Sequence, residues 1–163
     1  MSLSKTLDES RSESHCKGRK VRKVLELGNI RSESIVGIIL QDVRIDFGSL
    51  ENSILQGACI ERCQVEGLQA YETTMTECSV REVVLYSCYF DLCRFEDCDF
   101  TLTKFEGATL TNCSFTRCVF PDISIMPDKL GKDADFRDSI FTAVDISEFN
   151  KVRLRKRGAQ FFG

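Results

Sequence analysis

A large apolar residue returns at every fifth position of this chain, without interruption, from Ile30 to Ile125. Only Ala70 in that series of twenty is small. A second series of mostly small residues runs two positions earlier: Gly48, Ser53, Ala58, Cys63, Thr73, Cys78, Cys88, Cys93, Cys98, Thr103, Ala108, Cys113 and Cys118. Such a fixed short period is the signature of a repeat architecture, in which neighbouring units stack to bury a continuous core.

The period of five fits neither regular secondary structure. In an α-helix each step of five residues advances about 140° beyond a full turn, so the apolar positions would scatter around the axis. In a flat strand successive members of the series would point to opposite faces, because five is odd. All members face one interior only if the chain bends once in every repeat.

Four such bends close a square coil of 20 residues, with about 4.8 Å between stacked coils. The large residue of each repeat then fills the interior and the small residue lies beside it. Three further repeats centred on Phe136, Phe141 and Ile146 bring the total to 23. The sequence therefore predicts about six coils in a rod roughly 28 Å long.

One irregularity is consistent with this packing. At Leu68 and Ala70 the large residue takes the small position and the small residue takes the large one. The swap nearly keeps the summed volume, and protein cores tolerate such changes well.

The segments GATLTN, NCSFTR, RCVFPD, DADFRD and DSIFTA place a small residue two positions before Leu or Phe and two variable residues after it, and DADFRD also has Asp before the Phe. In this pattern the chain resembles the pentapeptide-repeat family, over about residues 28–147. The resemblance implies an all-β fold, a right-handed quadrilateral β-helix. This chain differs in preferring Cys in the small position and in often lacking Asp before the large one.

The repeat frame breaks once, between Ile125 and Phe136, which lie one residue more than two repeats apart. We expect a bulge or loop at about residues 127–133, since Pro and Gly favour turns. Loops on rigid scaffolds often carry binding residues, although a tolerated surface insertion is an equal alternative. The candidate binding loop is Pro127, Asp128, Lys129, Leu130, Gly131 and Lys132.

These patterns divide the chain into a polar, disordered head at 1–24, a repeat region at 25–147, and a C-terminal cap with a basic tail at 148–163. Val24, Leu25 and Leu27 are expected to cover the first coil. Ser147 is expected to cap a short helix whose Phe149 and Val152 lie over the last coil. For Phe161 and Phe162 at the end of the tail, two interpretations stay open. They form a homodimer or partner contact, or the tail folds back over the cap.

The net charge of −3 conceals a segregation along the chain. Residues 1–27 carry +3 and residues 148–163 carry +4, which leaves −10 on residues 28–147. An acidic body repels nucleic acid and attracts a basic protein surface, although a thin rod also needs charge for solubility. The basic tail is interpreted as solvated or paired with this body rather than as a nucleic-acid or membrane site.

Residues 20 apart stack in one column, so the position after each large residue forms lines of side chains on the surface. Partner-binding candidates in these acidic columns are Asp46, Glu66, Tyr86 and Glu106, with Glu51 and Asp91, and Glu61 and Glu96, in neighbouring columns.

We expect no enzyme activity, cofactor or metal site. The only histidine is His15, in the head, and no phosphate-binding or dinucleotide-binding glycine motif is present. Zinc ligands favour closer spacing than the five residues that separate Cys88, Cys93 and Cys98. The cysteines are expected to be reduced and to act as small hydrophobes, with Cys78, Cys98 and Cys118 in one column and Cys93 and Cys113 in another. Cys59 and Cys16 are the reactive candidates.

The expected function is a non-catalytic protein-interaction scaffold of unknown partner. Some pentapeptide-repeat proteins look like DNA mimics that bind DNA gyrase and protect it from quinolones, and the resemblance makes that role the first alternative here. The second is a secreted bacterial effector, with the basic, Ser-rich head as an export signal. No apolar run reaches the length of a membrane span or a signal peptide, so a cytoplasmic protein is expected unless it is exported without a cleaved signal.

Overall fold

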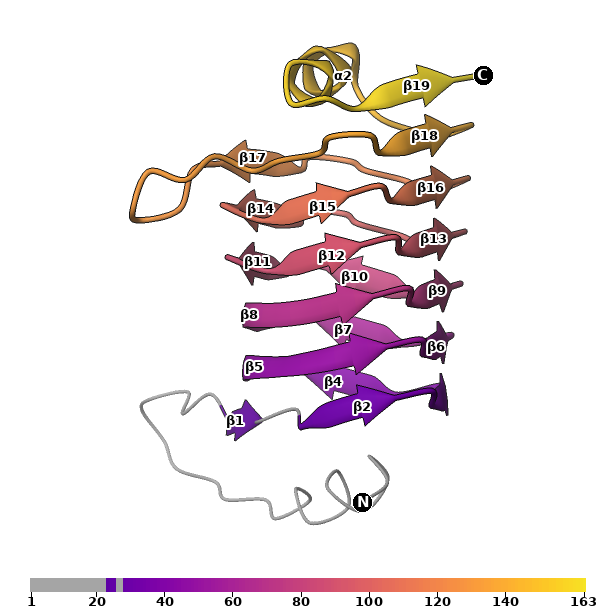
Figure 1. The fold of residues 1–163 in the computed structure, drawn as a ribbon, viewed down its shortest axis with the longest axis vertical. Coiled ribbons are helices and arrows are strands. Elements are labelled where there is room, and N and C mark those ends of the chain that lie inside the picture. The colour runs from indigo at the N-terminus through magenta and orange to yellow at the C-terminus, as the bar shows by residue number, and fades with distance from the viewer. Residues whose placement is uncertain (1–22, 26–27) are drawn as a thin grey trace.

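A computed structural model describes residues 23–25 and 28–163 of the chain. Its backbone winds into stacked coils that climb from the N-terminal end to the C-terminal end (Figure 1). In Figure 1 the front strands run to the right and the strands behind run to the left as the stack rises, so the coil is right-handed. The predicted quadrilateral β-helix is confirmed. The head predicted at 1–24 falls mostly on residues outside the described part, as do His15, Cys16 and Leu27.

Each coil has four faces, and the strands of adjacent coils pair in parallel. The first face consists of β1 (Lys23–Leu25), β5 (Val43–Glu51), β8 (Gln64–Tyr71), β11 (Val84–Tyr86), β14 (Lys104–Glu106) and β17 (Ser124–Met126). The second consists of β2 (Asn29–Arg31), the second halves of β5 and β8, β12 (Tyr89–Asp91) and β15 (Thr109–Thr111). The third consists of β3 (Ser34–Val36), β6 (Ile54–Gln56), β9 (Thr74–Thr76), β13 (Arg94–Glu96), β16 (Ser114–Thr116), β18 (Ile140–Thr142) and β19 (Gln160–Phe162). The fourth consists of β4 (Ile39–Gln41), β7 (Cys59–Glu61) and β10 (Ser79–Arg81), continued by isolated bridges through Asp99, Val119 and Asp145.

The strands pair in the register that the repeat predicts, since Ile45 lies beside Val65 and Phe95 beside Phe115, each 20 residues apart. The large residues from Ile30 to Ile125 are buried in one core, except Ile35 and Ile60, which are half-buried. The third face is seven strands deep, because β19 adds a layer after the C-terminal helix. The solenoid therefore has about seven turns rather than the six counted from the repeats.

The corners are turned by the residue two positions after each large one. In residues 23–25 and 28–163, seventeen non-glycine residues have positive φ, all of them at this position, for example Asn52 (48°) and Asn112 (52°). A left-handed conformation costs an L-residue about 1–2 kcal/mol. Most corners are held by hydrogen bonds between coils; the Asn52 N–H, for instance, donates to the Tyr71 carbonyl at 3.0 Å. This role was not predicted from the sequence, although Gly37, Gly57, Gly67 and Gly107 occupy the same position of the repeat and indicate it.

The composition of the core changes along the rod. Aliphatic residues fill the N-terminal coils, whereas aromatic rings fill the C-terminal ones. On the third face the rings of Phe95, Phe115, Phe141 and Phe161 stack with centroid separations of 4.7, 4.5 and 4.8 Å. Edge-on contacts such as Phe115 with Phe120, at 5.6 Å, join this column to the fourth face. Such ring pairs add attraction beyond simple area burial.

The frame break is a single insertion. Asp135 pairs with Thr109, which lies 26 residues earlier, whereas Ile125 pairs with Phe105 at the usual 20. Ile125 and Phe136 therefore occupy adjacent faces, one repeat step apart, and six residues are added between them. In Figure 1 this segment swings out beyond the stack between β17 and β18.

Helix α2 (Glu148–Arg155) covers the C-terminal end of the coils (Figure 1). Ser147 caps it as predicted, because its hydroxyl accepts from the Asn150 N–H at 3.3 Å. The expectation that Phe149 and Val152 lie over the last coil is wrong, since they are 70% and 48% exposed. The buried positions are instead Asn150 and Leu154, on the opposite side of the helix. Within the described residues, no helix is long and apolar enough to span a bilayer.

At the other end, Leu25 does not cover the first coil from outside. It belongs to the interior series, buried beside Ile45 in the β1–β5 pairing. Val24 points outward and is 53% exposed. Since Leu25 lies five residues before Ile30 and faces the core, the repeat begins one unit earlier than the sequence predicted.

Candidate interaction surface

The predicted column on the first face forms in register. Asp46 lies beside Glu66, Glu66 beside Tyr86, and Tyr86 beside Glu106. Each belongs to a different strand of one parallel sheet, so their spacing is fixed by the backbone ladder. The column is a straight line of outward side chains on a rigid support.

The side chain of Arg44 changes the charge of this column. Its guanidinium lies 2.5 Å from Asp46 Oδ1 through Nε and 2.7 Å from Glu66 Oε2 through Nη2. Hydrogen bonding to Asp46 raises the pKa of Arg44, and Glu66 acts in the same direction. Two of the three carboxylates in the column are therefore paired with one cation.

The second face continues the same surface. Glu51 lies beside Tyr71, and Tyr71 beside Asp91, while Tyr89 belongs to the neighbouring column. Tyr71 and Tyr89 are 42% and 43% exposed. The carboxylate of Glu72 raises the pKa of Tyr71, so its phenol stays protonated.

Strands β5 and β8 run through the corner between the two faces without ending, so the first and second faces form one sheet. All three tyrosines of the chain lie on this sheet. We call the sheet bearing Tyr71, Tyr86 and Tyr89 the tyrosine surface. It also carries Asp46, Glu66, Glu106, Glu51 and Asp91, the majority of the predicted acidic positions.

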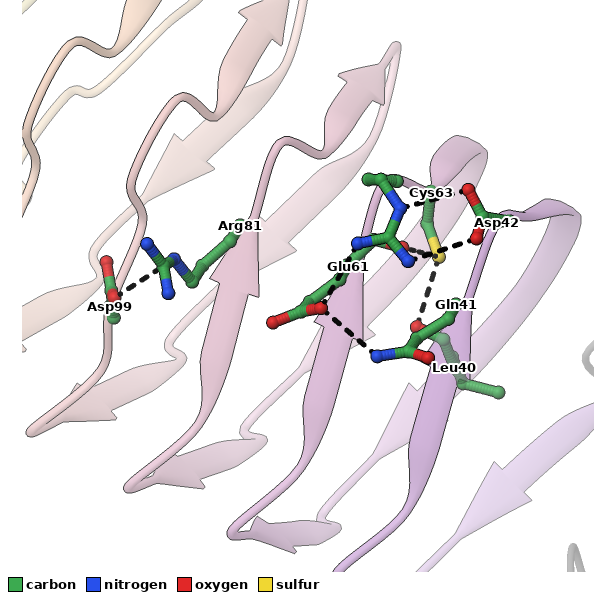
Figure 2. Close-up of polar contacts among 8 residues, drawn as sticks. Leu40, Gln41, Asp42, Glu61, Cys63, Arg81 and Asp99 are labelled. Atoms are coloured by element: carbon green, nitrogen blue, oxygen red, sulfur yellow. Dashed lines mark hydrogen bonds and ion pairs between the residues drawn. The ribbon is translucent and has the colours of Figure 1, made fainter.

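Glu61 and Glu96 do not belong to this surface or to a common column. Glu61 is on β7 of the fourth face and Glu96 is on β13 of the third. The 35 residues between them are not a multiple of the 20-residue coil, which separates them. Glu61 accepts from Gln41 Nε2 at 3.1 Å (Figure 2), and Glu96 pairs with Arg117.

The fourth face is a polar ladder rather than an acidic strip. Arg62 forms a two-pronged pair with Asp42 in which both N–O distances are 3.0 Å. One coil further, Arg81 approaches Asp99 at 3.5 Å (Figure 2). Each cation here links two adjacent coils.

The loop at 127–133 packs against the tyrosine surface. Lys129 Nζ lies 5.3 Å from the ring centroid of Tyr86, and Asp128 accepts from the Ser87 hydroxyl at 3.2 Å. Asp128 also accepts from the backbone N–H groups of Leu130 and Lys132, at 2.8 and 2.9 Å. These hydrogen bonds, that from Lys132 first, lower the pKa of Asp128. Leu130 at the tip is 92% exposed.

The two phenylalanines of the tail have different surroundings. Phe161 lies in β19 and stacks on Phe141, with the Arg155 guanidinium 5.2 Å from its centroid. Phe161 is thus part of the C-terminal cap, in agreement with the interpretation that the tail folds back over the last coil. Phe162 is 54% exposed and is the member of the pair still available for a contact. Arg157 ties the tail to the loop through Asp133 at 3.1 Å.

Residues 72–120 match the family model described as pentapeptide repeats, in 8 copies. This chain is a pentapeptide-repeat protein. The matched segment contains the coils in which large, small and corner positions recur most regularly. No curated protein matches the chain.

Among solved structures, this pentapeptide-repeat protein is similar to Rfr23 from the cyanobacterium Cyanothece 51142, at 15% identity, 73% coverage of this chain, 88% of that chain and a TM-score of 0.46. It is similar to QnrB1, a plasmid-mediated fluoroquinolone resistance protein, at 10% identity, 86% and 71% coverage and a TM-score of 0.34. It is also similar to HetL from Nostoc sp. strain PCC 7120, a pentapeptide-repeat protein involved in heterocyst differentiation regulation, at 10% identity, 90% and 83% coverage and a TM-score of 0.23.

In this pentapeptide-repeat protein, Thr and Cys at the small interior position also donate hydrogen bonds, a role that was not predicted from the sequence. Thr73 Oγ1 donates to the Leu50 carbonyl at 3.1 Å, and Cys98 Sγ lies 3.4 Å from the Met75 carbonyl. Both carbonyls belong to large core residues 23 positions earlier. The presence of Ser, Thr and Cys at one register was the available signal, because all three carry a donor.

The cysteine columns form as predicted. The thiol of Cys98 interacts with those of Cys78 and Cys118, and Cys93 with Cys113. All eight described cysteines are free thiols. Burial raises the pKa of Cys88 to about 12.

Cys59 is outward-facing and half-buried, as its register predicts. Partial burial, followed by the charge of Glu61, raises its pKa. A thiol is nucleophilic only as the thiolate, so this environment works against the predicted reactivity. Within the described part of the chain, no group of three or more His, Cys, Asp or Glu side chains is arranged to hold a metal ion.

Proposed function

We propose that this pentapeptide-repeat protein is a non-catalytic protein-interaction scaffold that binds a basic protein surface through its tyrosine surface. The observation that carries the proposal is the placement of all three tyrosines, with five carboxylates, on the one sheet shared by the first and second faces. Tyrosine is enriched in protein interfaces and at their energetic hot spots.

The geometry of the surface supports binding with little loss of freedom. Tyr71, Tyr86 and Tyr89 project from strands that are paired on both sides, so their backbone is already ordered. Rigid aromatic anchors lower the entropic cost of association. The carboxylates around them would speed encounter with a basic partner.

The acidic side chains also suit binding better than catalysis. Asp46, Glu66 and Asp91 lie on the convex outside of the coil, each with a partner in hydrogen-bond range. A catalytic acid or base needs a pocket that shifts its pKa and holds a substrate. The proposal therefore assigns these carboxylates to partner recognition.

The test is affinity capture with the full chain from an extract of the source organism. We expect a captured partner to be lost with Tyr71→Ala/Tyr89→Ala and retained with Glu96→Gln, the matched control on the third face. Raised salt should weaken capture, because charges at the rim of an interface are screened. Equal capture by the double variant and the wild type would overturn the proposal.

The DNA-mimic role is the second candidate, and it rests on the in-register carboxylates of Asp46, Glu66 and Glu106. Arg44 pairs with two of them, so the column presents less negative charge than its residues alone suggest. A supercoiling assay with purified gyrase separates the two candidates. Inhibition at micromolar protein that Glu106→Gln relieves would favour the mimic, and no effect would remove it.

The secreted-effector alternative depends on the head, which lies almost entirely outside the described residues. A reporter fused to residues 1–25 tests it independently of the surface. Export of the reporter would support the effector role, and retention in the cell would count against it.

A further inference from the structure

We propose that the N-terminal coils contain a partly open apolar cavity that stays dry and binds a small apolar guest of about the size of a xenon atom. The cavity has a volume of about 80 Å³ and follows the axis of the coil. Its walls come from core residues between Ile30 and Leu110, including Leu50, Val65 and Ala70. This site is separate from the tyrosine surface, which faces outward on the same coils.

The cavity follows from the fold. The width of a coil is set by four strands and four corners, and neighbouring coils are locked by the backbone ladder in the same 20-residue register along most of the rod. The interior of each coil is therefore nearly constant in size. The C-terminal coils fill it with stacked rings such as Phe115 and Phe141, 4.5 Å apart. The N-terminal coils supply only smaller aliphatic groups, and the paired backbone cannot move inward to close the gap.

Ala70 is the clearest local cause. It lies between Leu50 on the coil before and Phe90 on the coil after, so one position in that column lacks a large side chain. Leu68 compensates in part, since it is buried over the Gly48 position. Both Leu68 and Ala70 nevertheless line the cavity, which shows that the exchange of sizes does not restore the volume.

The lining offers nothing to a water molecule. Among the lining residues that the structure describes, only Thr73 and Cys93 have polar side chains. Thr73 Oγ1 donates to the Leu50 carbonyl at 3.1 Å, and Cys93 Sγ lies 3.5 Å from the Ala70 carbonyl. A buried water needs two or more polar partners, so a cavity of this kind stays dry.

Size and chemistry together define the guest. An apolar cavity of about 150 Å³ in another protein stays dry and binds benzene or xenon. With about 80 Å³, this cavity suits a single xenon atom or a hydrocarbon of a few carbons that carries no hydrogen-bonding group. Entry is easiest at the first coil, where the lining residues Ile35 and Ile38 are only half-buried.

The test is methyl NMR of the full chain under xenon pressure. We expect saturable shifts at the methyl groups of Leu50, Val65 and Leu85 and none at Leu154, which is buried at the other end. Ala70→Leu should abolish the response while the rest of the spectrum is kept. If Ala70→Leu does not fold, Val65→Ile replaces it and should weaken the response.

A gain-of-site variant tests the physical cause. Phe115→Leu removes a ring from the filled half and should create a second xenon-responsive set of methyl groups around it. The proposal is overturned if the wild type gives no saturable shifts, if both ends respond equally, or if a folded Ala70→Leu protein responds like the wild type.

Discussion

The two halves of the rod share one backbone and differ in how they fill it. In the N-terminal coils, aliphatic side chains such as Val65 and Ala70 leave an apolar cavity, whereas in the C-terminal coils rings such as Phe115 and Phe141 stack at 4.5 Å. Pairing between coils continues across the boundary without a change of register. The backbone hydrogen bonds between coils therefore set the width of the coil, and this width does not depend on how completely the core side chains fill it.

The halves also differ at their ends and corners. The C-terminal half is covered by α2 and β19, and its first-face corner is overlaid by the loop through Asp128. In the N-terminal half the corner glycines Gly37 and Gly57 are open to solvent, because a methyl group added to either Cα would meet no atom within 4 Å. We therefore expect substitutions at these two open corners to cost less than a substitution at Gly107, which Asp128 overlies.

The largest expected effect is the loss of a ring from the stacked half. Phe115→Ala should lower the free energy of unfolding by about 3–5 kcal/mol, because Phe115 is fully buried between Phe95 and Phe141. Leu55→Ala, in the same column of the aliphatic half, should cost less because Leu55 already borders the cavity. Urea unfolding measures both. Equal losses would contradict the difference in packing between the halves.

The next comparison enlarges two inward side chains of the first face, one in the N-terminal half and one in the C-terminal half. Val65→Ile adds a methylene beside the cavity and should stabilise the fold by up to about 0.8 kcal/mol. Ile125→Phe adds a ring at a fully buried position and should destabilise it by about 1–3 kcal/mol. Unfolding midpoints give the signs. A loss of stability in both variants would show that the N-terminal core cannot use the extra volume.

A third comparison concerns two corner glycines with nearly the same φ. Gly57→Ala, at φ 61°, should cost about 1–2 kcal/mol for the left-handed conformation alone. Gly107→Ala, at φ 60°, should cost about 1 kcal/mol more, because its methyl group would lie 2.6 Å from Asp128 Cβ and disturb the Ser87 hydrogen bond. Thermal unfolding measures the costs, and faster proteolysis of the loop should accompany only Gly107→Ala. Cleavage at the same rate in both would show that the loop does not depend on this corner.

The smallest expected effect is a dependence on pH. A two-pronged hydrogen bond from Arg117, with both N–O distances 2.8 Å, lowers the pKa of Asp97 below its ordinary value. The resulting stabilisation is present above the unfolded-state pKa of about 3.9 and is lost as the pH falls through the lower folded-state value. Asp97→Asn should therefore be less stable than the wild type near neutral pH and equal to it in strong acid. Urea unfolding midpoints of both proteins, measured from neutral pH to strong acid, test this prediction. A difference in stability that does not change with pH would show that the Asp97–Arg117 ion pair is not its cause.

The path of the backbone could be predicted from the amino-acid order alone. A large residue at every fifth position, such as Phe95, Phe100 and Phe105, can share one interior only if the chain turns once per repeat, and the 20-residue coil follows. The register of columns such as Asp46 and Glu66 follows from the same count. These features were predictable because they depend on periodicity.

Features that depend on volume and on neighbours in other coils became visible only in the folded chain. The cavity beside Ala70, the pairing of Arg44 with Glu66, and the return of Phe161 to the core column all join residues about 20 apart or more, whose side-chain positions a repeat count does not supply. The length of the insertion likewise followed from the pairing of Asp135 with Thr109. A periodic pattern fixes which side chains face inward, whereas their sizes and partners act only after the coils are stacked.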